Sequence, residues 1–127
     1  MDAILFSVDP KFTCVEKEAI RHLARHPKLY WEVRFRVDKK HLDQNNKNRF
    51  HFPLYGYMHI KGEQVKYRAT IIGILPFLPS HYESKEAEQF KPKVWIREWE
   101  ECKKVRELQW KYTLVINKIT KLKVLAA

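Results

Sequence analysis

The sequence predicts a single α+β domain in which a curled antiparallel β-barrel of about six strands carries one main helix near the N-terminus. The 127 residues are enough for one sizeable core but too few for two, so 1–127 is expected to be one domain. Strand-like segments outnumber helical ones, and no repeat or linker rich in Gly, Pro or Ser divides the chain. Because a sheet of this kind must hide its edges, we expect it to close or to be covered.

The N-terminal part is expected to fold as a strand, a helix and a second strand. The apolar run Ala3–Val8 ends at a turn signal, which is typical of a buried strand. Thr13 and Glu16 have the spacing of a capping box, and apolar residues then recur at helical spacing over about three turns. Tyr30–Val37 alternates between apolar and polar residues, which predicts a half-buried strand with a basic outer face.

The rest of the chain is expected to supply a hairpin and two further strands. A turn containing Gly62 separates two strand-like runs, and prolines stop the second of them. The expected elements are a polar loop at Asp38–Asn48, strands at Pro53–Lys61 and Val65–Leu75, a short helical turn within Ser80–Lys93, a strand at Val94–Trp99, a loop at Glu100–Gln109 and a last strand within Trp110–Lys123.

The charge balance favours a polyanionic partner. The chain has 25 Lys and Arg against 15 Asp and Glu, a formal net charge of +10. The excess is concentrated in residues 31–68 and again in residues 111–123, which suggests a basic face. Such a face favours nucleic acid first and an anionic membrane second, and the alternative is an ordinary solvated surface rich in charge.

Little in the sequence points to catalysis, a cofactor or a metal. Three unclustered glycines exclude a phosphate-binding loop, and His22 and His26 lack further ligands. Cys14 and Cys102 are too few for a disulfide framework, which fits a reduced, cytoplasmic chain. The longest apolar stretch, Ala69–Leu78, falls short of the ~20 residues that span a membrane. We therefore expect a binding domain and no enzyme, with no cofactor.

Aromatic and basic residues lie close together along the chain. Aromatic residues make up 13% of the sequence, and Trp31, Tyr67 and Trp95 each have arginines nearby. Rings beside cations can stack a base while the cations bind its phosphates. The alternative is that the four tryptophans fill the core of a small barrel.

The order and character of four segments resemble the PUA-like superfamily, in particular its EVE and YTH branches. Those domains begin with a strand and a helix, continue with a strand that opens on an aromatic pair, and close with a Trp-rich segment before a last strand. The matching segments are ILFSVDP (Ile4–Pro10), LYWEVRF (Leu29–Phe35), YGYMHIKGEQVKYRATIIGILPF (Tyr55–Phe77) and KVWIREWEECKKVRELQWKYTLVINKITKL (Lys93–Leu122). The resemblance implies a PUA-like, EVE/YTH-type barrel.

The resemblance also implies an aromatic cage that encloses one flipped, modified base. Trp31 matches the first wall of this cage, and either Trp95 or Trp99 matches the second. Ser7 and Asp9 match the polar positions that hydrogen-bond the edge of the base. The expected base-binding residues are thus Ser7, Asp9, Tyr30, Trp31, Trp95 and Trp99.

Basic residues on the strands and loops around such a cage would hold the backbone of the nucleic acid. The expected phosphate contacts are Arg34, Arg36, Lys39, Lys40, Lys66, Arg68, Lys91, Lys93 and Arg97.

The function that the resemblance implies is recognition of a methylated base, with N6-methyladenine in DNA as the expected target. By the same analogy the chain would be a monomeric domain cut from the N-terminus of a longer, archaeal McrB-like restriction GTPase. Three alternatives stay open: an RNA-binding module of translation or RNA modification, a small ASCH-like enzyme acting on nucleosides, and a protein-interaction module. The enzyme would need a buried Lys or carboxylate in its pocket.

Overall fold

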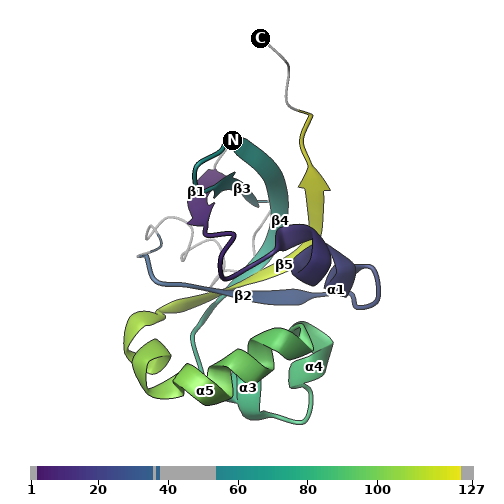
Figure 1. The fold of residues 1–127 in the computed structure, drawn as a ribbon. Helices are drawn as coiled ribbons and strands as arrows, with labels where there is room; N and C mark the ends of the chain where they lie inside the picture. Colours follow the sequence, from purple (N-terminus) through teal and green to yellow (C-terminus); the bar gives the residue numbers. More distant parts are fainter. Residues whose placement is uncertain (1–2, 36, 38–53, 124–127) are drawn as a thin grey trace.

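The computed structural model describes residues 3–35, 37 and 54–123, so the expected polar loop Asp38–Asn48 lies outside the described residues. Within this part, five strands form one sheet in the order β1-β3-β4-β5-β2 (Figure 1). The strands are β1 (Ala3–Val8), β2 (Leu29–Val33), β3 (Leu54–Ile60), β4 (Val65–Pro76) and β5 (Tyr112–Lys121). The sheet curls into a half-barrel and carries several helices, which makes the domain α+β.

The sheet is mixed, whereas the sequence predicted an antiparallel one. β1 pairs in parallel with β3, and the other three pairs of strands are antiparallel. The reason is that the helix after β1 carries the chain to the opposite edge of the sheet, where β2 pairs with β5. β1 therefore pairs with β3, which enters from a later part of the chain. The hairpin between β3 and β4 is confirmed, and Gly62 in its turn has a φ of +83°, a conformation that favours glycine.

The predicted N-terminal helix is present but begins differently. It consists of one π-helical segment, η1 (Val15–Ile20), followed by a short α-helix, α1 (Arg21–Leu23). The expected capping box is wrong, because the backbone N–H of Cys14 donates to the carboxylate of Glu18 and no side-chain cap forms. Val15 and Ala19 are buried against the core of the sheet.

The segment before the last strand is helical, so the predicted strand Val94–Trp99 and the predicted loop Glu100–Gln109 are both wrong. Three helices, α3 (Ser80–Glu83), α4 (Ala87–Phe90) and α5 (Lys93–Gln109), lie on the side of β2 away from β1 and β3 (Figure 1). The α5 segment lacks Gly and Pro and is rich in Glu, Lys and Arg, which favours a helix. A helix also places Trp95 and Trp99 on one face, because they are four residues apart.

The core fills the concave side of the sheet. The inward residues of β3 include Gly56, where an added Cβ would lie 2.9 Å from Cε1 of Phe6 and 3.0 Å from Cδ1 of Ile71. The absence of a side chain at Gly56 thus lets the Phe6 ring pack directly over β3. The fully buried side chains include Leu29, Met58, Ile71, Ile74, Trp99, Leu114 and Ile116. Among the described residues, no helix has both the length and the hydropathy needed to cross a membrane.

Candidate nucleic-acid interface

Trp99, one of the two candidates for the second cage wall, is a core residue. Its side chain is 0% exposed, and its ring stacks on Tyr82 with the ring centroids 4.8 Å apart. Its indole N–H donates to the carboxylate of Glu83 over 3.3 Å. The rings of Phe77 and Trp110 lie 5.6 and 5.9 Å away, so the indole is surrounded by protein. This position does not fit the predicted role, since it leaves no face of Trp99 for a base.

Trp31 and Trp95 do come together, as an edge-to-face pair. Their ring centroids are 5.2 Å apart and the ring planes are inclined by 79°. Trp95 is 7% exposed, and its indole N–H donates to Glu18 over 2.8 Å. Trp31 is half-buried and also contacts the edge of Phe6. The two indoles are neighbours, but they contact each other directly, edge to face. They therefore do not form two parallel walls with room for a base between them.

Lys91, predicted to contact phosphate, is buried and forms an internal ion pair with Glu32. It is 1% exposed, and its Nζ contacts the Glu32 carboxylate and donates to the carbonyl of Tyr30 over 3.1 Å. Nζ also lies 3.9 Å from the ring centroid of Tyr82, whose hydroxyl donates to Glu32 over 2.6 Å. Burial lowers the pKa of Lys91 to about 8, against the opposing effect of the Glu32 charge. Lys91 therefore does not fit the role of a phosphate contact.

A second layer of polar and aromatic contacts surrounds this pair. The Tyr30 ring stacks on Phe90 at 4.4 Å, and burial raises the pKa of the Tyr30 hydroxyl. Nδ1 of His81 lies 3.1 Å from the hydroxyl oxygen of Thr113, and burial lowers the pKa of His81. The ASCH-like alternative requires a buried lysine or carboxylate in its pocket. Lys91 and Glu32 are buried, but they pair with each other between the helices and the sheet. The contacts of Lys91 and Glu32 hold α3 and the end of α4 on β2, and the contact of His81 with Thr113 joins α3 to β5. The ring of Tyr30 packs against Phe90 of α4.

The other predicted site residues are divided among several places. Ser7 is exposed on β1, whereas Asp9 accepts the backbone N–H of Lys11 over 3.0 Å and pairs with Lys61 at 3.5 Å. The bond from Lys11, and then the Lys61 charge, lower the pKa of Asp9, despite an opposing desolvation effect. Asp9 thus stabilises the turn after β1. Arg34, Lys93 and Arg97 are exposed, and Arg36, Lys39 and Lys40 lie outside the described residues.

Two of the predicted phosphate contacts, Lys66 and Arg68, lie on a solvent-facing surface of the sheet. We call this surface the outer face; it is the convex side of β1, β3, β4 and β5. Along β3 the inward residues are buried, while Tyr55, Tyr57 and His59 alternate with them and are partly exposed. Strand pairing places Leu5, Tyr57, Arg68 and Thr120 in one row across the four strands.

Some cations of the outer face have an acidic partner, and others have none among the described residues. Lys66 forms an ion pair with Glu63 at 2.9 Å. Lys118 and Lys123 are exposed and form no ion pair with any described residue. The Arg68 guanidinium lies 4.4 Å from the ring centroid of Tyr55, and its buried Nε has no acceptor within the described part of the chain. The face therefore carries an excess of positive charge next to aromatic rings.

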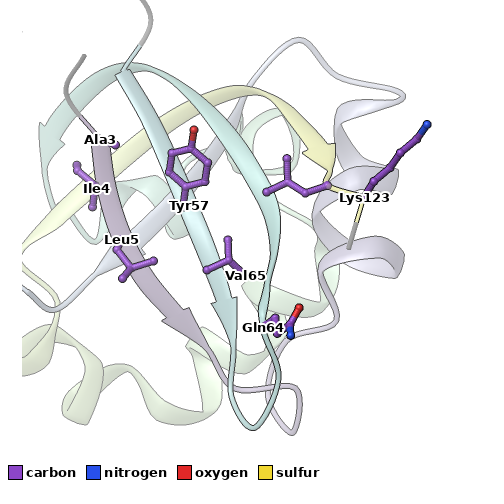
Figure 2. A pocket seen from close by; sticks show the side chains of 8 residues that line it. Ala3, Ile4, Leu5, Tyr57, Gln64, Val65 and Lys123 are labelled. Carbon is purple, nitrogen blue, oxygen red and sulfur yellow. The ribbon is translucent and has the colours of Figure 1, made fainter. Parts of the chain in front are cut away.

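An open depression of about 520 Å³ indents this face (Figure 2). Tyr57 stands beside side chains of β1 and near Val65 at the start of β4. Leu5 is 68% exposed, so its side chain presents apolar surface to solvent on this face. The residues that line the depression are Ala3, Ile4, Leu5, Tyr57, Gln64, Val65, Leu122 and Lys123.

The sequence held one signal for this surface. Alternate positions of a predicted strand are occupied by Tyr55, Tyr57 and His59. Because side chains alternate between the two sides of a strand, these three must lie on the same side. Which residues would lie beside them depends on strand order, and the parallel pairing of β1 with β3 is not visible in a local pattern.

His22 and His26 stack on each other at 4.4 Å and form no metal site in the described structure. Nε2 of His22 lies within hydrogen-bonding distance of the carbonyls of Lys28 and Gln89, and burial lowers its pKa. More widely, the described residues hold no group of three His, Cys, Asp or Glu side chains that could bind a metal ion.

Comparisons of the chain with models of protein families, with curated proteins and with solved structures found no significant match.

Proposed function

We propose that this chain is a nucleic-acid-binding domain whose contact surface is the outer face. The observation that carries the proposal is the row of side chains across adjacent strands, in which Tyr57 on β3 lies between Leu5 on β1 and Arg68 on β4. A sheet surface with aromatic and basic side chains offers stacking and phosphate binding at once. Both kinds of contact are needed, because phosphate contacts give affinity and base contacts give selectivity.

Electrostatics supports the same proposal. The formal net charge of +10 attracts polyanions at long range, and Lys118 and Lys123 are exposed on or beside the outer face without an acidic partner among the described residues. Each lysine that neutralises a phosphate releases a counterion, so binding should weaken steeply as salt increases. A protein-interaction surface of mixed charge would depend on salt much less.

The test measures binding of fluorescein-labelled DNA and RNA by anisotropy at several salt concentrations. Replacing Lys118 and Lys123 together by Gln should weaken binding and lower the slope of log K against log salt by roughly 0.7–0.9 per lost contact. The matched control replaces Lys103 and Lys104, two exposed lysines of α5, and changes the net charge equally. The proposal would be contradicted if the two double replacements weakened binding equally, or if binding did not depend on salt.

Recognition of a methylated base is a second candidate, and the proximity of Trp31 and Trp95 favours it. In this case Trp95 would have to turn away from Glu18 so that the two indoles could enclose a base. This candidate includes the narrower expectation of a cytoplasmic restriction module that reads N6-methyladenine, with RNA as the alternative target. The test is Trp31→Ala with methylated and unmethylated DNA: loss of the preference for methylated DNA supports the candidate, and an unchanged preference contradicts it.

A further inference from the structure

We infer that the outer face binds single-stranded nucleic acid and that one unpaired base occupies the depression beside Tyr57. The inference rests on the proposed function and specifies its substrate class. The lining of the depression is apolar along most of its length and polar only at Gln64, at Lys123 and at the Tyr57 hydroxyl.

The apolar lining calls for a ligand with an apolar surface. Leu5 is 68% exposed at one side of the depression, and Leu122 lines it from the end of β5. Figure 2 shows the Tyr57 ring standing out from β3 between the side chains of β1 and Val65. A nucleobase presents two apolar faces and a polar edge, so a base against Tyr57 would cover ring and leucine surface that otherwise contacts water.

A double helix cannot make this contact. In a duplex the faces of the bases are stacked on each other, and only the backbone and the groove edges are accessible. A duplex on the outer face would contact the lysines and gain nothing from Leu5 or Tyr57. A single strand exposes the faces of its bases, so it can use both the rings and the cations.

The polar groups around the depression match the remaining parts of a nucleotide. Gln64 has an amide that both donates and accepts, as the edge of a base requires. Lys123 lies at the rim, and Arg68 is opposite Tyr57 on the next strand. Both cations lie on the β4 and β5 side of Tyr57, where they can bind the phosphates of a strand whose base stacks on the ring.

The experiment compares three labelled probes of about 12 nucleotides, within the range of site sizes for single strands. They are a thymidine strand, an abasic strand of equal length and a mixed-sequence duplex. We expect Tyr57→Ala to weaken binding of the thymidine strand by about tenfold and to leave the other two probes unchanged. Tyr57→Phe, which keeps the ring, should bind like the unchanged protein, and a thermal melt of each variant checks its folding.

The outcomes separate the inference from the proposed function. Salt-dependent binding of all three probes with equal affinity, or an equal effect of Tyr57→Ala on each, would overturn the inference and keep nucleic-acid binding. Failure of every probe to bind would overturn both. Tighter binding of the thymidine strand that Tyr57→Ala abolishes would support both.

Discussion

Replacing Lys91 by Met should strongly destabilise the domain, although Met is apolar and similar in length. Lys91 is 1% exposed and Glu32 9% exposed, so the variant would leave a buried carboxylate without its cation. Breaking a buried ion pair in this way costs about 3–5 kcal/mol. The Tyr82 hydroxyl still donates to Glu32, which offsets part of this cost. We therefore expect the free energy of unfolding to fall by about 3 kcal/mol.

A second replacement should restore most of this loss. The double variant Lys91→Met, Glu32→Gln removes both charges, and the glutamine carbonyl can still accept the hydrogen bond from Tyr82. Exchanging a buried ion pair for uncharged residues of similar size often leaves stability unchanged. The free energy of unfolding of the double variant should therefore lie within about 1 kcal/mol of that of the unchanged protein. The strong coupling between the two positions is the signature of an ion pair.

Urea denaturation followed by tryptophan fluorescence measures these free energies. Lys61→Met is the matched control, because Lys61 pairs with Asp9 at 3.5 Å on the surface, where its side chain is 74% exposed. Its loss should cost less than about 1 kcal/mol. A cost for Lys91→Met as small as that of the control would refute the reasoning. Additive effects in the double variant would refute it as well.

Two further predictions concern stability. Burial holds the pKa of Lys91 near 8 in the folded protein instead of 10.5. Between pH 8 and pH 10.5 the lysine therefore takes up a proton when the protein unfolds. The free energy of unfolding should rise with pH from about 8 to about 10.5. Denaturation across this range tests the prediction, and it is contradicted if the slope of unfolding free energy against pH matches that of Lys91→Met. Gly56→Ala should lower the free energy of unfolding by about 1–3 kcal/mol, because the added methyl group would overlap the Phe6 ring. Urea denaturation measures this change. An unchanged free energy of unfolding would contradict the prediction and show that the ring moves away easily.

The sequence predicted most strands well because each depends on a local pattern. The bounds expected for the β3–β4 hairpin differ from the observed ones by at most one residue, since alternation and the Gly62 turn specify it. The α5 segment was misread because Trp95 and Trp99 are four residues apart, a spacing that fits one side of a strand as well as one face of a helix. The run of Glu, Lys and Arg that follows favours the helix and extends it to Gln109.

The candidate site was less predictable because it depends on contacts between distant residues. Lys91 and Glu32 are 59 positions apart, and nothing in the local sequence distinguishes this lysine from those on the surface. The same holds for the outer face, where Tyr57 has Leu5 beside it only because β1 pairs with β3 in parallel. Sequence patterns give the side of a strand on which a residue lies, but strand order decides which side chains become its neighbours.

The positions of the helices explain why the outer face, and not the Trp-rich segment, is the better candidate for binding. In the described structure η1 and α1 contact β5, α4 contacts β2, and α3 and α5 contact the neighbouring helices. The side chains of Trp95 and Trp99 on α5 are buried. Burying one large apolar side chain contributes about 1.5–3 kcal/mol, so these tryptophans stabilise the fold where they are, and withdrawing one for a ligand would cost a similar amount. Leu5 and Tyr57 carry no such cost, since Leu5 is exposed and Tyr57 partly exposed before any ligand arrives. A base that covered them would gain contact area without first unpacking the core.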